Sequence, residues 1–213
     1  MKKLFIIIAV LTVFSSCLRL DDNMYAPTTL ESYNLKGNVS EGEIDIPAEY
    51  DIDDNLIHLF TLDSKGENET ESTKIYAVYI GDTNRISSDT VIVYCHGNSY
   101  NMDVYWTRAK LLANLGHKNR FGVLMMDYRG YGMSEGYPTE EGLYIDVNTC
   151  FSWLKNKNLT DDRLIIYGFS MGTAPASELT ANPRSMTPSK LLLEAPFASV
   201  AVMVDDAALL ANT

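Results

Sequence analysis

Apolar and polar positions follow two alternating patterns along most of the chain. Short strand-like segments occur at 91–95, 122–127, 164–167 and 191–193, and the unbroken apolar run at 91–95 is typical of a strand covered on both faces. Between them, apolar residues recur with helical spacing, as at Leu143, Val147, Cys150, Phe151 and Leu154. This order predicts a doubly wound, mostly parallel α/β sheet with helices on both faces.

Two earlier apolar runs, 56–62 and 74–80, flank a polar turn and predict an antiparallel hairpin at the N-terminal edge of that sheet. Helices are expected at 103–115, from a capping Thr139 to about Leu154, directly after Ser170, and at 200–210. The chain then ends, so we expect the strand at 191–193 to be an exposed edge.

The first residues predict a targeting segment. Lys2 and Lys3 precede an apolar run at 4–14 that is short for a bilayer span, and small residues lead to Cys17. This arrangement resembles a bacterial lipoprotein signal at 1–16, after which Cys17 would carry the lipid. An ordinary signal peptide or an uncleaved anchor is the alternative. The lipoprotein interpretation implies a chain anchored by lipid in the bacterial cell envelope, on the periplasmic or surface face of the outer membrane.

Polar residues with scattered Pro, Gly, Asn and Ser make up 17–50, which we interpret as a tether between the anchor and the domain at 51–213. A formal net charge of -11 argues against a nucleic-acid partner, because phosphate binding needs clustered Lys and Arg. No Cys/His spacing indicates zinc, and no other metal or organic cofactor is implied. The oligomeric state is left open.

Cys95 and Cys150 fall in an apolar run and on an apolar helix stripe. Each is expected to be a buried free thiol. A disulfide between them is the alternative in an oxidising compartment.

Gly-x-Ser-x-Gly occurs twice, around Ser134 and around Ser170. A nucleophile elbow needs a strand that runs into the first glycine and a helix that leaves the last one. The sequence around Ser170 has both, whereas Tyr137 and Pro138 follow the other match. We therefore predict Ser170 as the nucleophile and Ser134 as a loop residue.

Side chains at Gly168 and Gly172 would collide with the neighbouring strand and helix where this turn is tightest. The helix that follows aims its free N–H groups at the space beside Ser170, so the Met171 amide is expected to bind an oxyanion there. A second donor is expected from the loop after strand 91–95. Gly97 lets this backbone approach, and the Asn98 amide is the candidate.

His96 begins the same loop, and we expect it to orient the loop instead of acting as a catalytic base. Asp127 and Arg129 follow the next strand and so lie on the same edge of the sheet. For this pair, a structural ion pair or backbone hydrogen bonds are favoured over a catalytic role. Asn101 is expected either to start a helix or to serve the site.

Three motifs together carry a family resemblance: His-Gly-Asn-x-x-Asn from His96, Asp-Tyr-Arg-Gly-Tyr-Gly-x-Ser-Glu-Gly from Asp127, and Gly-Phe-Ser-Met-Gly from Gly168. In this order they resemble the α/β-hydrolase superfamily, and within it the Bem46-like branch of ABHD12-, ABHD13- and ABHD17-type serine hydrolases, with likeness to the serine aminopeptidase S33 group. The resemblance implies hydrolysis of a small-molecule ester, thioester or amide by acyl transfer through Ser170, with the Asn98 and Met171 amides holding the oxyanion.

The same resemblance implies two further strand–helix units that carry the triad Asp and His, and this sequence does not contain them. Its histidines are His58, His96 and His117, and none stands where the family places the base. We therefore expect a partial hydrolase domain that is nearly inert as written. A non-catalytic lipid-anchored binding protein or a truncated pseudoenzyme is the alternative.

Overall fold

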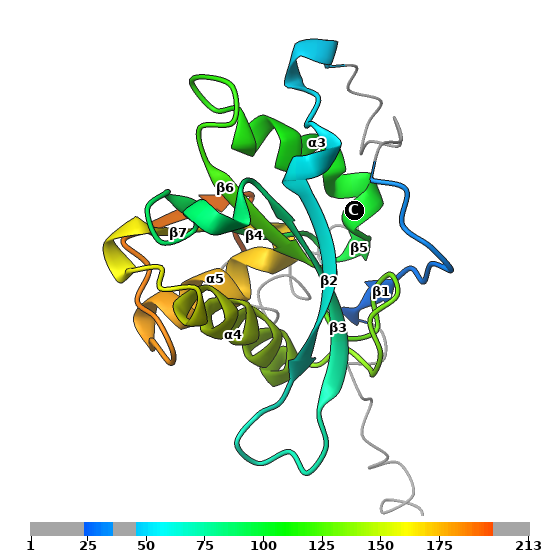
Figure 1. The fold of residues 1–213 in the computed structure, drawn as a ribbon. Helices are drawn as coiled ribbons and strands as arrows, with labels where there is room; N and C mark the ends of the chain where they lie inside the picture. Colours follow the sequence, from blue (N-terminus) through cyan, green and yellow to red (C-terminus); the bar gives the residue numbers. More distant parts are fainter. Residues whose placement is uncertain (1–23, 36–45, 198–213) are drawn as a thin grey trace, which may run out of the picture.

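A six-stranded mixed sheet forms the centre of the protein, with the strand order β2-β3-β6-β4-β7-β8 (Figure 1). The computed structural model describes residues 24–35 and 46–197. The strands are β2 (Ile57–Ser64), β3 (Thr73–Ile80), β4 (Val91–Cys95), β6 (Gly122–Met126), β7 (Leu164–Phe169) and β8 (Lys190–Glu194). The last four in spatial order run parallel, while β2 and β3 form an antiparallel edge hairpin. The predicted fold class is confirmed.

Helices cover both faces of the sheet. Helix α3 (Met102–Ala113) packs on one face, with a buried cluster that includes Tyr94 and Met125. Helices α4 (Glu140–Asn156) and α5 (Thr173–Ala181) pack on the other face and against each other (Figure 1). Because both faces are covered, the central strands β4 and β6 are buried throughout, as their unbroken apolar runs predicted.

Side chains fix where two of these helices begin. The Asn101 side chain accepts a hydrogen bond from the Asp103 amide at 3.2 Å and starts α3, which settles Asn101 as a helix cap. Thr139 accepts from the Gly142 amide at 3.0 Å and starts α4, as predicted. Short 3-10 turns occupy Ala48–Tyr50, Asp54–Leu56, Thr83–Arg85, Asp161–Arg163 and Ser170–Gly172.

The register of the parallel strands brings three chemically interesting segments to one edge of the sheet. Cys95 at the end of β4 lies opposite Gly168 of β7, and Tyr94 lies opposite Met125 of β6. The segments that follow these strands therefore share the carboxyl-end edge. We call them the 96–101 loop, the 127–136 loop and the 168–172 turn.

Residues 24–35, which we call the strap, cross the first two of these loops. Strand β1 (Ala26–Pro27) pairs in parallel with β5 (Ser99–Tyr100), and Thr29 forms a bridge with Gly132 (Figure 1). The sequence assigned these residues to the tether. The structure instead packs them on the domain, because their backbone groups find partners in both loops.

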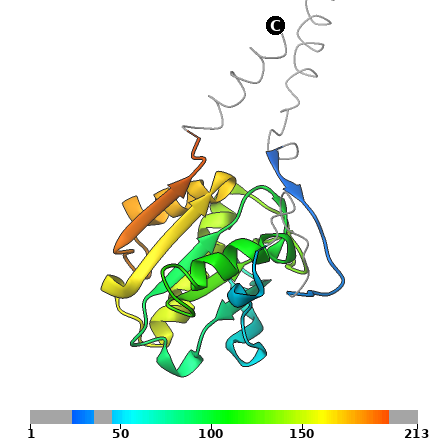
Figure 2. The same cartoon turned by 90° about the horizontal axis from the view of Figure 1, so that it is seen from above.

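Strand β8 is an edge strand within the described residues (Figure 2). Its leucines Leu191, Leu192 and Leu193 are 37%, 44% and 41% exposed, as expected for a strand with one neighbour. The predicted signal at 1–16, the predicted lipidation site Cys17, the tether residues 18–23 and 36–45 and the predicted helix at 200–210 lie outside the described residues. Among the helices that the structure does describe, none is both long and apolar enough to span a bilayer.

Candidate active site

Ser170 occupies a sharp turn between β7 and α5. Its φ angle is +49°, in the left-handed region that residues with a side chain rarely adopt. The residue is partly exposed, and no described residue hydrogen-bonds its hydroxyl. The turn is held by the Thr173 hydroxyl, which donates to the Ser170 carbonyl oxygen at 2.6 Å. The result is a strained backbone that presents, at the carboxyl-end edge of the sheet, a hydroxyl that no residue of 24–35 or 46–197 engages.

The glycines on either side of Ser170 leave no room for a side chain. A Cβ at Gly172 would lie 2.0 Å from the carbonyl oxygen of Cys95, at the end of β4. A Cβ at Gly168 would lie 2.5 Å from the Gly172 carbonyl oxygen. Both neighbours are backbone atoms that cannot rotate away, so β4, β7 and the start of α5 approach this closely only with glycine at both positions.

Tyr131 joins the two residues that were predicted to bind an oxyanion. Its buried hydroxyl lies 2.7 Å from Asn98 Oδ1 and 3.7 Å from Met171 Sδ. Asn98 and Met171 therefore lie on either side of one side chain of the 127–136 loop. Sequence reasoning missed Tyr131, and its only signal was an aromatic residue between two glycines of that loop.

His96 is fully buried and does not bond Ser170. Its Nδ1 lies 2.8 Å from the Gly97 carbonyl oxygen. Its Nε2 lies 3.2 Å from Asp127 Oδ1, although the alignment is too poor for a hydrogen bond. Asp127 also accepts from the Met102 amide at 2.9 Å, at the start of α3. The pair thus connects the beginnings of the 96–101 and 127–136 loops inside the protein.

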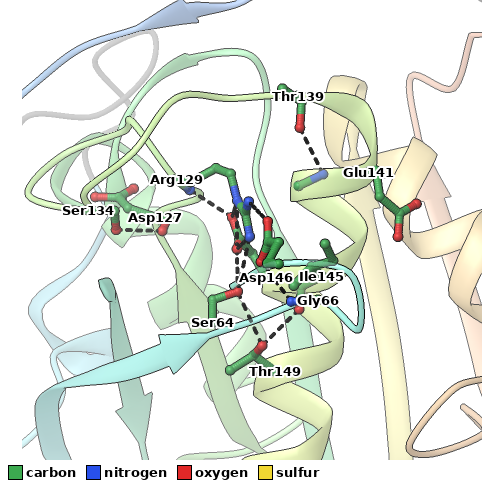
Figure 3. Close-up of polar contacts among 12 residues, drawn as sticks. Ser64, Gly66, Asp127, Arg129, Ser134, Thr139, Glu141, Ile145, Asp146 and Thr149 are labelled. Carbon is green, nitrogen blue, oxygen red and sulfur yellow. Dashed lines mark hydrogen bonds and ion pairs between the residues drawn. The ribbon is translucent and has the colours of Figure 1, made fainter. Parts of the chain in front are cut away.

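Arg129 binds residues that are distant in sequence, not its neighbour Asp127. Its Nη2 lies 2.9 Å from Oδ1 of the fully buried Asp146 on α4, and its Nη1 lies 2.7 Å from Glu69 (Figure 3). Ser64 donates to the same Asp146 carboxylate at 2.6 Å. Burial opposes the charge on Arg129, but these hydrogen bonds outweigh it and raise the Arg129 pKa. The guanidinium is therefore a structural cation that ties the hairpin to α4.

Ser134, the second serine in a Gly-x-Ser-x-Gly sequence, has a fully committed hydroxyl. It donates to the Asp127 carbonyl oxygen at 2.7 Å and accepts from the Tyr76 amide at 2.8 Å (Figure 3). The residue is buried. Ser134 is thus buried and held by two backbone groups, whereas Ser170 is partly exposed.

The other two histidines lie at the opposite end of the sheet. His58 is the second residue of β2. The first residue, Ile57, lies opposite Ile80 of β3, which in turn lies opposite Val123 near the beginning of β6. His117 precedes β6 and is exposed. All three histidines of the sequence are among the described residues, and none hydrogen-bonds Ser170.

Glu194, the acid at the end of β8, is tied to neighbours on the α3 face. Arg108 Nη1 lies 2.7 Å from its Oε2, and the Tyr167 hydroxyl donates to the same oxygen. Partial burial disfavours the carboxylate, but the hydrogen bonds from Arg108 and Tyr167 prevail and lower the Glu194 pKa. In turn, burial and Glu194 raise the pKa of Tyr167 to about 12.

A polar groove of about 830 Å³ lies away from Ser170, between the loop 65–69, the start of α4 and residues 183–185. It contains none of the predicted catalytic residues. Among residues 24–35 and 46–197 there is no group of three His, Cys, Asp or Glu side chains that could hold a metal ion. Cys95 and Cys150 are both buried, free thiols.

Known proteins match the part of the chain that contains the three edge segments. The family model described as "alpha/beta hydrolase fold" matches residues 90–196, which contain all three edge segments. A lysophosphatidylserine lipase, ABHD12, of Gallus gallus is 35% identical over 122 residues, 54% of this chain and 30% of that protein. A multifunctional-autoprocessing repeats-in-toxin protein of Vibrio vulnificus is 34% identical over 117 residues, 54% of this chain and 2% of its own length.

Solved structures agree on the fold. An esterase from Pyrococcus furiosus superposes with a TM-score of 0.51 at 19% identity, covering 76% of this chain and 55% of the esterase. The chain thus spans about half of that structure and less than a third of the lipase. The family match covers half of the sequence and includes the strained turn at Ser170 and both loops beside it. On this basis the chain belongs to the α/β-hydrolase fold family.

Proposed function

We propose that Ser170 is the nucleophile of a serine hydrolase that cleaves an ester, thioester or amide of a small acyl substrate. The Ser170 hydroxyl would attack the acyl carbonyl carbon, and the carbonyl oxygen would become an oxyanion as the carbonyl π bond breaks. The amides of Asn98 and Met171 are the proposed donors to that oxyanion. In well-studied enzymes one such donor is worth roughly 3 kcal/mol of transition-state stabilisation.

The observation that carries this proposal is the left-handed backbone of Ser170, which presents a partly exposed serine at the carboxyl-end edge of the sheet. Such strain persists only where the surroundings enforce it, and it is common at catalytic turns. Ser134 provides the contrast, because the same motif there has a buried hydroxyl with two hydrogen bonds.

We propose that the chain of 213 residues reacts slowly as it stands, because none of the three histidine rings of the sequence hydrogen-bonds Ser170. A base must take the proton of the attacking hydroxyl. In a serine protease, loss of the base lowers turnover by on the order of a millionfold. The second candidate is an inert chain that binds an acyl ligand at the same edge of the sheet. The lack of a histidine hydrogen-bonded to Ser170 favours it.

A lipid acyl ester is the substrate class that we propose. The name of the Gallus gallus relative, a lysophosphatidylserine lipase, favours it. The proposed lipid anchor also favours a lipid substrate, because it would hold the site near the membrane. Cys17 precedes Met24 by seven residues. A fully extended connection of that length spans at most about 25 Å. Since Met24 contacts Asn98, a lipidated Cys17 would keep this edge of the domain close to the membrane.

Prolonged incubation with a fluorophosphonate, followed by peptide mass spectrometry, tests the nucleophile. We expect a single modified serine, Ser170, and loss of the modification in Ser170→Ala. Ser152→Ala is the matched control, because Ser152 lies on α4 and its hydroxyl bonds only the Asn148 carbonyl oxygen. Modification of another serine, or none at all, would contradict the proposal. In the latter case, binding of a fatty-acid ester to the unmodified chain would favour the second candidate.

A further inference from the structure

The strap binds both loops that lie beside the turn at Ser170. The Asn98 side chain is held by the strap from two directions: its Nδ2 donates to the Met24 carbonyl oxygen at 2.6 Å, and its Oδ1 accepts from the Ala26 amide at 3.0 Å. An Asn side chain thus pairs with the strap backbone as another peptide group would. The residue whose amide is proposed to bind the oxyanion is thereby fixed by its own side chain.

The strap continues this pairing along the rest of the 96–101 loop. Ala26 lies opposite Ser99 and Pro27 opposite Tyr100 in the parallel β1–β5 pair. Tyr100 has a φ angle of +72°, a left-handed conformation that a bulky residue holds only when neighbours enforce it. At the end of the loop, Asn101 Nδ2 donates to the Thr28 hydroxyl at 3.1 Å. The loop is therefore held in a strained conformation by a segment about seventy positions earlier in the chain.

Tyr33 extends the strap to the interior of the site. Its hydroxyl donates to Asp127 Oδ2 at 2.6 Å and accepts from the Met133 amide at 2.9 Å. The other oxygen of Asp127 accepts from the start of α3 and faces His96. Burial, together with the nearby Asp127 charge, raises the Tyr33 pKa, so the hydroxyl keeps its proton for this bond. Tyr33 thus ties the strap directly to the 127–136 loop and, through Asp127, to His96 at the start of the 96–101 loop and to the start of α3.

We propose that residues 24–35 are a positioning element of the active site, which holds the 96–101 loop so that the Asn98 amide faces Ser170. The expected effect on catalysis rests on the proposed function, whereas the positioning of the 96–101 loop by the strap does not depend on that function. The simpler interpretation is that the strap only adds stability. The two interpretations differ in what happens locally at the 96–101 loop when one hydroxyl is removed.

Amide hydrogen exchange of the full chain, read by mass spectrometry, tests the positioning. Tyr33→Phe removes one hydroxyl without changing shape, and Asn98→Asp keeps Oδ1 but removes the donor to Met24. We expect exchange of the 96–101 segment to accelerate at least about tenfold in both variants, with β4 and β6 unchanged as internal references. Tyr144→Phe is the matched control, since its hydroxyl bonds Glu140 within α4. Unchanged exchange at 96–101, or equal acceleration over the whole domain, would overturn the proposal.

The rate of fluorophosphonate labelling tests whether this positioning matters for catalysis. A displaced Asn98 amide weakens only the bond-forming step. Tyr33→Phe should therefore lower the maximal labelling rate about tenfold while the probe concentration for half-maximal rate stays constant. An unaltered maximal rate would show that the strap does not serve catalysis. If the wild-type chain is not labelled at all, the proposed function fails, and the exchange experiment still decides whether the strap positions the loop.

Discussion

The carbonyl oxygen of Cys95 lies so close to Gly172 that a Cβ on this glycine would be 2.0 Å from it. This single contact sets how near β4 can approach the start of α5. It therefore also sets where Ser170 stands relative to the 96–101 loop, which begins one residue after Cys95.

Gly172→Ala should destabilise the domain by about 3 kcal/mol or more, because the added carbon meets rigid backbone that must move. Urea unfolding followed by circular dichroism measures the loss. Gly66→Ala is the control: its Cβ would lie 2.6 Å from the end of the Ile145 side chain, which can rotate away. We expect a cost of about 1 kcal/mol or less there. Equal costs at the two positions would mean that the close approach of β4 to α5 does not exist.

Ser170→Gly should be more stable than Ser170→Ala by about 1 kcal/mol, because only glycine adopts a φ angle of +49° without a Cβ penalty. Both variants lack the hydroxyl, so the comparison isolates the backbone. Thermal unfolding of the two proteins in parallel provides the measurement. An alanine variant at least as stable as the glycine variant would show that residue 170 is not strained.

Asp146→Asn should cost about 3 kcal/mol, because it leaves the Arg129 cation beside a neutral amide in a buried place. Denaturant unfolding is again the readout. Glu141→Gln provides the comparison, since it removes a surface pair with Arg184 whose side chains are 62% and 32% exposed. Such pairs contribute less than about 1 kcal/mol. A mild effect at Asp146 would mean that Glu69 alone satisfies Arg129.

Cys95 and Cys150 should resist alkylation in the native protein, because burial raises the pKa of both thiols and shields them from reagent. In a Cys17→Ser variant, iodoacetamide at pH 8 should add nothing to the folded chain and two groups after unfolding in urea. Intact-mass spectrometry counts the additions. Two hydrogens fewer than the expected mass, with no alkylation after unfolding, would reveal a disulfide instead.

Local patterns in the sequence predicted the sheet, the edge hairpin and the turn at Ser170. Runs such as 91–95 reflect burial on both faces, and a strand followed by Gly-x-Ser-x-Gly and a helix requires one kind of turn. These features depend on neighbours within a few residues, which is why Thr139 could be identified as a helix cap before the structure was known.

Partners distant in sequence were decided by the tertiary structure. Asp127 and Arg129 were expected to form a structural ion pair or backbone hydrogen bonds. Asp127 does accept from the Met102 amide, but the ionic partners of Arg129 are the distant Asp146 and Glu69. Tyr33 was assigned to a tether, yet it binds Asp127, 94 positions away. Hydrophobic periodicity determines which face of an element is buried, but only the packed arrangement of the sheet determines which loops meet at its edge. The local sequence therefore determined the tight turn at Ser170, whereas the contacts of the strap and of Tyr131 beside that turn arise because segments distant in sequence converge at one edge of the sheet.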